Sequence, residues 1–217
     1  MTLEEAIAKI KPLDHNAMEI AQKRWDSIAK PLHSLGKLET LLIQIAGITG
    51  NAEVDLSRRG LIAMCADNGV VEEGVTQTGQ EVTAIVAENF LKYDTSVGVM
   101  CKQNHAEIFP VDMGMVTDTK VRTDHKIAYG TQNMTKGPAM TREQAVKGLE
   151  AGIDMVRELN DKGYRILATG EMGIGNTTTS SAVASVLLKQ PVEEMTGRGA
   201  GLTSEGLVRK INAIKKA

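Results

Sequence analysis

A glycine-rich segment over residues 169–178 carries the side chains best suited to chemistry. It reads Thr-Gly-Glu-Met-Gly-Ile-Gly-Asn-Thr-Thr and lies between a predicted strand and a predicted helix. In open parallel sheets, ligands sit beyond the carboxyl ends of the strands, and unpaired amides at a helix N-terminus attract anions. Gly173 and Gly175 let the backbone approach a ligand closely. The first helical turn adds three short polar side chains, those of Asn176, Thr177 and Thr178. The segment predicts a phosphate site, or else a tight turn that only caps a helix.

Known nucleotide-binding motifs fit this segment poorly. Gly173 and Gly175 match the first two glycines of the dinucleotide fingerprint, but Thr178 stands at the third position. No Gly-Lys-Ser/Thr follows, which excludes a P-loop. Glu171 is the unexpected residue, because a carboxylate beside an anion site is unfavourable unless it serves a substrate or pairs with a cation. It is either a hydrogen-bond acceptor or proton handler for a heterocycle, or a carboxylate that pairs with Arg or Lys or faces solvent.

A second glycine segment, Gly197-Arg-Gly-Ala-Gly201, could form another backbone cradle for a ligand. Lys210 follows it on the last predicted helix. A lysine in such a place is usually a solvated surface charge, but it could also reach a phosphate.

Polar residues also follow two other predicted strands. Asp67-Asn68-Gly69 and Asp112-Met113-Gly114 occupy the same carboxyl-end position as the glycine-rich segment. Each alone is typical of a turn, but three polar strand ends together indicate a shared cleft. The four histidines and two cysteines show no metal-ligand spacing, so we expect no metal, and no nucleophile elbow is present.

The elements that must position these residues alternate between strands and helices. Strands are predicted at 61–66, 106–111 and 164–168, and helices at 17–28, 38–46, 80–93, from the capping box 141–144 onward, at 182–187, and at the end of the chain. This order favours an α/β fold with a parallel-sheet, Rossmann-like domain over residues 51–217, preceded by a small helical N-terminal part over residues 1–50. Residues 115–140 show no period and predict a long irregular stretch.

Composition narrows the class of protein further. The 217 residues are 42% apolar with a net charge of -2, which gives no reason to expect a nucleic-acid partner. The N-terminus has no signal-peptide pattern, and no apolar run is long enough to span a membrane. Cys65 and Cys101 are expected to be buried free thiols. A cytoplasmic protein without a membrane partner is expected.

Seven stretches, in this order, resemble the nicotinate-nucleotide–dimethylbenzimidazole phosphoribosyltransferase (CobT) family. They are residues 34–39, 65–70 running to 73–75, 80–83, 111–114, 138–141, 170–178 and 196–202. The resemblance implies an enzyme that moves phosphoribose from nicotinate mononucleotide to 5,6-dimethylbenzimidazole or a related base. The products would be nicotinate and α-ribazole 5'-phosphate, for the lower ligand of cobalamin. It implies no cofactor and no metal, small-molecule substrates, and a homodimer.

The resemblance also implies roles for individual residues. Glu171 and Lys210 would support catalysis. The nucleotide and its phosphate would contact Gly173, Gly175, Asn176, Thr177, Thr178, Gly199, Ala200 and Gly201. The base would lie against Thr78, Val86 and Met172.

Two departures from the family pattern matter. Thr78-Gly79 stands where the family often has Tyr-Pro or Ser-Pro, a change that would alter the accepted base or loosen the loop. The family's general-base glutamate lies in a C-terminal segment beyond these 217 residues. The chain is therefore expected to be truncated and inactive alone, as a fragment, part of a split enzyme or a non-catalytic homologue that binds the base or nucleotide. A generic dinucleotide-dependent oxidoreductase is a weaker alternative.

Overall fold

The computed structural model describes all residues from Met1 to Ala217. The chain divides into two compact units, Met1–Ser57 and Arg58–Ala217, whereas the sequence suggested a boundary after residue 50. No helix is both long enough and apolar enough to cross a membrane.

The N-terminal unit consists of the helices α1 (Leu3–Ala8), α2 (His15–Ser27) and α3 (Lys37–Thr49). Helices α2 and α3 pack closely at Gly47. A side chain at this position would overlap that of Met18, so glycine permits the close approach. The 34–39 stretch has a structural role in this unit. Buried Glu39 pairs with Lys30 at 2.8 Å and accepts the amide hydrogen of Leu35 at 3.1 Å. This carboxylate fixes the connection into α3.

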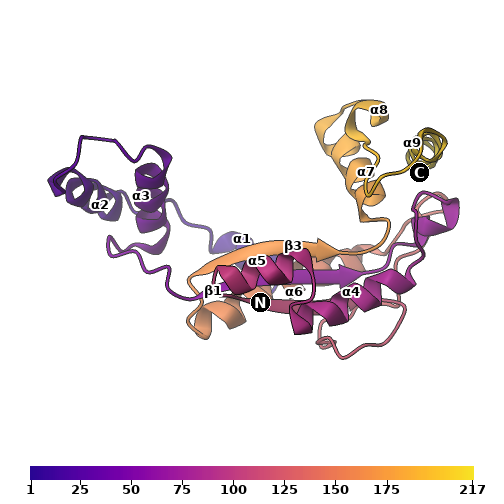
Figure 1. The fold of residues 1–217 in the computed structure, drawn as a ribbon, viewed down its shortest axis with the longest axis horizontal. Coiled ribbons are helices and arrows are strands. Elements are labelled where there is room, and N and C mark those ends of the chain that lie inside the picture. The colour runs from indigo at the N-terminus through magenta and orange to yellow at the C-terminus, as the bar shows by residue number, and fades with distance from the viewer. The chain divides into compact units, whose positions relative to one another are not determined.

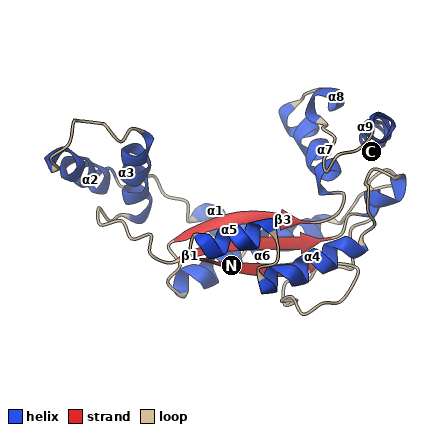
Figure 2. Ribbon diagram, in the orientation of Figure 1, coloured by secondary structure: helices blue, strands red, loops and turns tan.

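The second unit is built on three parallel strands, β1 (Arg59–Ala66), β2 (Ala106–Gly114) and β3 (Ile166–Met172). Their order in the sheet is β2-β1-β3, so β1 lies in the centre (Figures 1 and 2). The short apolar run that predicted the first strand alternates between two cores, because successive side chains of a strand point to opposite faces. Ala63 and Cys65 enter one core, and Ile62 enters the other.

Helices α4 (Glu81–Lys92) and α5 (Ser96–Gln103) cover the first face of the sheet (Figure 1). Ala87 and Phe90 of α4 pack on the Ala63–Cys65 side of β1. Cys65 and Cys101 are free and buried, as expected. Burial, with the nearby charge of Asp112 adding to it, raises the pKa of the Cys65 thiol to about 12. This thiol is therefore unreactive at neutral pH.

Helix α6 (Arg142–Asp161) covers the opposite face. The predicted capping box is present, because Thr141 and Gln144 exchange side-chain and backbone hydrogen bonds at its start. Met155 and Leu159 are buried against the sheet beside Tyr164, whose ring meets Phe109 edge-on at 5.1 Å.

The remaining elements are the short 3-10 helix η1 (Gly69–Glu73) and the helices α7 (Asn176–Leu188), α8 (Val192–Met195) and α9 (Ser204–Lys216). The parallel α/β class, the three strands and the irregular stretch between β2 and α6 are confirmed. The strand boundaries differ from the predicted ones. Strand β1 begins already at Arg59, β2 ends at Gly114 rather than at residue 111, and β3 begins only at Ile166. Strand β3 runs through Met172, so Gly170 and Glu171 belong to the strand and the turn begins only at Gly173. Hydrogen bonding to β1 extends the strand this far.

Replacing Met155 with Ala should lower the free energy of unfolding by about 2–5 kcal/mol, because it leaves a cavity under the sheet. Val156→Ala, on the same helix but with 46% of the residue exposed, is the matched control and should change it by less than about 0.5 kcal/mol. Urea unfolding followed by circular dichroism measures both. Equal effects of the two substitutions would contradict the assignment of this core.

Candidate functional site

A pocket of about 170 Å³ opens at the glycine-rich turn that follows β3. Its lining comes from the turn itself, from the loop before α4 and from the second glycine segment. Eight of the residues expected at a site line it together: Thr78, Met172, Gly173, Gly175, Asn176, Thr177, Gly199 and Ala200. Segments more than a hundred residues apart in the sequence therefore form one concave surface.

The glycines of the turn are required by its geometry. A side chain at Gly173 would overlap the carbonyl oxygen of Ala66 at the end of β1. Gly175 has φ +92 and provides the N-cap position of α7, a backbone conformation that residues with a side chain rarely adopt. The turn can thus pass tightly from β3 into α7 and present its backbone to the pocket.

Several backbone amides of the turn are already used within the chain. Ile174 N–H donates to the Thr83 hydroxyl at 3.0 Å, Asn176 N–H to the Gly173 carbonyl at 2.9 Å, and Thr178 N–H to the Gly175 carbonyl at 2.9 Å. The amides of Gly175 and Thr177 have no hydrogen-bond partner in the chain. The turn therefore offers an anion a narrower set of donors than its sequence suggests.

Lys210 lies directly behind this turn. Only 1% of the residue is exposed, which excludes the interpretation as a solvated surface lysine and leaves the interpretation as a lysine within the site. Its ammonium group donates to the Thr177 hydroxyl at 2.7 Å and to the Gly197 carbonyl at 3.1 Å. Burial lowers the pKa of Lys210. One positive charge thus connects α9, the start of α7 and the second glycine segment.

Arg198 and Gln77 line the pocket and were not singled out from the sequence. Arg198 donates to the Leu202 carbonyl at 2.8 Å and to the Ser204 hydroxyl at 3.1 Å, which folds the second glycine segment back on itself. Gln77 donates to the carbonyl of Gly201 at 2.6 Å. The sequence did contain a signal for Arg198, because a basic side chain inside a glycine-rich segment is a common arrangement at anion-binding sites.

Glu171 has no Arg or Lys partner, and the residue is exposed at the end of β3. The protein atoms around its carboxyl group nevertheless raise its pKa through desolvation, and a hydrogen bond from the Asn176 side chain opposes that shift. A carboxyl group with a raised pKa next to a pocket is a candidate for proton transfer or for accepting a ligand hydrogen.

Three expected contact residues lie outside the lining. Val86 packs with Met172 against the core under α4. Thr178 is fully buried, and its hydroxyl has no hydrogen-bond partner. Gly201 lies next to the lining and uses its carbonyl for Gln77.

Asp67, which directly follows β1, and Asp112, which lies near the end of β2, are buried and serve the fold. Asp67 accepts the amide hydrogen of Val116 at 2.8 Å, and Asp112 accepts those of Gly114 and Met115 at 2.9 and 2.8 Å. Asp112 also pairs with Lys126 at 3.1 Å. These bonds hold the segment after β2, and neither carboxylate lines the pocket. No group of three or more His, Cys, Asp or Glu side chains is arranged to hold a metal ion.

Comparison with known proteins defines the class. Residues 10–217 match a family model described as "Phosphoribosyltransferase". The chain belongs to this phosphoribosyltransferase family. The description of this family does not match the dinucleotide-dependent oxidoreductase that glycines after a strand could also have indicated.

Individual relatives make the family more specific. The chain is 51% identical to the nicotinate-nucleotide–dimethylbenzimidazole phosphoribosyltransferase of Ruminiclostridium cellulolyticum, over 100% of this chain and 62% of the relative. It is 46% identical to the protein of the same name from Clostridium tetani, over 99% of this chain and 60% of the relative. The crystal structure of CobT from Thermus thermophilus superposes with a TM-score of 0.86 at 36% identity, covering 93% of this chain and 62% of that one. The chain spans about three-fifths of the length of these relatives.

The raised pKa of Glu171 gives a prediction with a defined sign. The folded state holds this proton more tightly than the unfolded state, so the resulting stability is present in acid and is lost as pH rises through the raised pKa. We expect Glu171→Gln to be more stable than the parent chain near neutral pH, with the difference disappearing below the ordinary pKa of a glutamate. Urea unfolding at both pH values measures it.

Glu81→Gln serves as the control for that experiment. Glu81 is exposed in the first turn of α4, where a negative charge favours the helix. Loss of this charge should lower the free energy of unfolding near neutral pH by about 0.3–1 kcal/mol. This change is opposite in sign to the change expected for Glu171→Gln. A Glu171→Gln variant that is less stable than the parent at neutral pH would contradict desolvation of this carboxyl group.

Proposed function

We propose that this protein transfers phosphoribose from nicotinate mononucleotide to 5,6-dimethylbenzimidazole or a related base, which yields nicotinate and α-ribazole 5'-phosphate. The observation that carries the proposal is the single pocket in which both glycine segments meet in front of Lys210. Membership of the phosphoribosyltransferase family and the names of the relatives support the same reaction.

The phosphate of the nucleotide would bind at the start of α7. Unpaired amides of Gly175 and Thr177 are available there, at the positive end of the helix dipole. Arg198 on the pocket wall and Lys210 behind Thr177 add positive charge. Gly199 lies against Thr177, and its lack of a side chain leaves space for a phosphate oxygen.

The base would occupy the part of the pocket near Thr78 and Met172. Val86 would act from behind, by holding Met172 in the core. The Glu171 carboxyl group is the nearby acceptor, and its raised pKa suits a group that exchanges a proton with a heterocycle.

The chemistry requires mainly positioning. The acceptor nitrogen forms a bond to the anomeric carbon of the ribose while the bond to nicotinate breaks, and the ring nitrogen that carried positive charge leaves with the bonding electrons. Removal of the proton from the other nitrogen of the base makes it a better nucleophile. Holding both reactants together lowers the entropic cost of the encounter. Glu171 and Lys210 support this step, and we assign the main general base to a segment outside these 217 residues.

The proposal includes a compartment and an assembly. We place the reaction in the cytoplasm, since both cysteines are free thiols. The homodimer expected from the resemblance stays a prediction, and sedimentation measures it.

The function is tested by calorimetry and by mass spectrometry of reaction mixtures. The 217-residue chain should bind nicotinate mononucleotide but form little or no α-ribazole phosphate when the base is added. The Ruminiclostridium cellulolyticum relative serves as the positive control. A folded chain that binds neither substrate would contradict the proposal, and binding without turnover in a protein of the relatives' full length would support a non-catalytic binding homologue instead.

Two glycines of the second segment provide a matched pair for the phosphate contact. In Gly199→Ala the new methyl group would lie 2.8 Å from the Thr177 hydroxyl at a φ of +57, whereas nothing lies within 4 Å of a methyl group at Gly197. Gly199→Ala should weaken binding of nicotinate mononucleotide about tenfold, since strain of this kind costs about 1–3 kcal/mol. Gly197→Ala should change it less than about twofold. Calorimetry measures both, and equal affinities would exclude this wall from the nucleotide site.

A further inference from the structure

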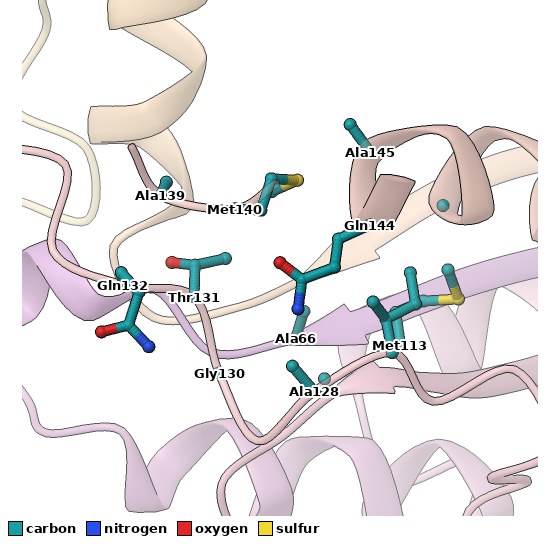
Figure 3. Close-up of a pocket in the computed structure, with 13 residues that line it drawn as sticks. Ala66, Met113, Ala128, Gly130, Thr131, Gln132, Ala139, Met140, Gln144 and Ala145 are labelled. Carbon is teal, nitrogen blue, oxygen red and sulfur yellow. The ribbon is translucent and has the colours of Figure 1, made fainter. Parts of the chain in front are cut away.

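A second pocket, of about 240 Å³, lies at the carboxyl ends of β1 and β2 (Figure 3). Ala66 and Met113 form its floor, and the irregular segment and the first turns of α6 form its walls. It shares no lining residue with the pocket at the glycine-rich turn, and the proposed phosphoribosyl transfer does not use it.

The sheet topology makes this a favoured place for a ligand. The chain leaves β1 toward α4 and α5 on one face, and it leaves the neighbouring strand β2 toward α6 on the other face (Figure 1). Two adjacent strands whose connections diverge in this way leave a crevice beyond their carboxyl ends, where ligands of open α/β sheets bind. The pocket lies at this crevice.

The lining favours an uncharged aromatic ligand. None of its residues is charged, so it would not compensate an ionised group. Met113 and Met140 both line it, and thioether sulfur atoms adapt to aromatic rings and make favourable contacts with them. The volume is far above that of a water molecule, about 30 Å³ in the liquid, and below the roughly 300 Å³ at which pockets for drug-sized ligands begin. One or two fused rings therefore fit.

Two side chains of the pocket, those of Gln144 and Thr131, can donate a hydrogen bond to a ligand. The amides of Gly130, Thr131 and Gln132 are used in bonds to backbone carbonyls. The Gln144 side-chain oxygen accepts the Thr141 amide hydrogen at 2.9 Å, which leaves its Nε2 without a partner in the chain. Figure 3 shows this carboxamide extending from α6 toward Ala66 and Thr131. The Thr131 oxygen accepts from Gly69 at 3.1 Å, so its hydroxyl hydrogen can also be donated.

We propose that this pocket binds a small uncharged aromatic molecule that carries one hydrogen-bond acceptor, such as a ring nitrogen, which accepts from Gln144 Nε2. This pocket is separate from the phosphoribosyl-transfer site, and the proposal does not depend on that function being correct.

The test uses two probes of equal shape, isoquinoline and naphthalene, which differ in the single ring nitrogen. Each is titrated into the ¹⁵N-labelled 217-residue chain at about pH 8, and amide shifts are recorded by NMR. We expect isoquinoline to shift the amides of Thr131, Ala145 and Gly148 and to bind about fivefold to tenfold more tightly than naphthalene, the factor that one hydrogen bond provides.

Two variants test separately the hydrogen bond from Gln144 and the open volume of the pocket. Gln144→Glu keeps an acceptor for the Thr141 amide, because glutamate serves equally in a capping box, but it removes the Nε2 donor. This substitution should weaken the binding of isoquinoline at least about tenfold, since it also places a carboxylate against the ring nitrogen. It should weaken the binding of naphthalene less. Ala145→Leu, at an exposed position on α6 that lines the pocket, should abolish binding of both probes.

Several results would overturn the proposal. These are no binding to the folded chain up to about 1 mM isoquinoline, shifts centred on Gly173–Thr177 instead, or equal binding by the parent chain and both variants. Nicotinate mononucleotide binding is measured on the same variants. Its retention in Ala145→Leu would show that loss of isoquinoline binding is not a failure of the nucleotide site.

Discussion

The burial of the Lys210 ammonium group is the constraint on which the candidate site depends. A charge removed from water is tolerated only where hydrogen bonds replace its solvation. Here those bonds come from the Thr177 hydroxyl and the Gly197 carbonyl, so α9, α7 and the loop between them must keep one arrangement. The same cation raises the positive potential at the start of α7, where amides remain unpaired. The Lys210 side chain thus fixes the arrangement of α7 and α9 and also favours an anion at the start of α7.

Two buried carboxylates fix the chain beside the other edge of β1, as the buried Lys210 does at the glycine-rich turn. The chain between β2 and α6 contains no regular element, yet its start is fixed because Asp67 and Asp112 accept backbone amides that no helix or strand satisfies. Lys126 from the same segment neutralises part of this charge. Irregular backbone can therefore form a pocket wall with defined geometry.

The fold was largely predictable because its signals are local. Short apolar runs and the polar or glycine residues beside them located the three strands, and the Thr141 capping box located α6. The chemistry of the glycine-rich turn was likewise evident in its residue types. Its end point was not, because pairing with β1 carries β3 through Glu171 to Met172. The environment of Lys210 was also out of reach, since its partners come from two other segments and only the tertiary fold brings them together. Arg198 was missed although its contacts are local, because a basic side chain inside a glycine-rich segment was not recognised as part of a site.

Asn68 has a consequence beyond its place at the end of β1. Its side chain donates to the Ile174 carbonyl of the glycine-rich turn, while the next amide, that of Gly69, donates to the Thr131 hydroxyl in the wall of the second pocket. Two neighbouring residues therefore hydrogen-bond to the walls of both cavities, although neither residue lines them. Any occupant that displaces this dipeptide from one side alters the free energy of occupancy on the other, and thermodynamic reciprocity requires the effect to be equal in both directions.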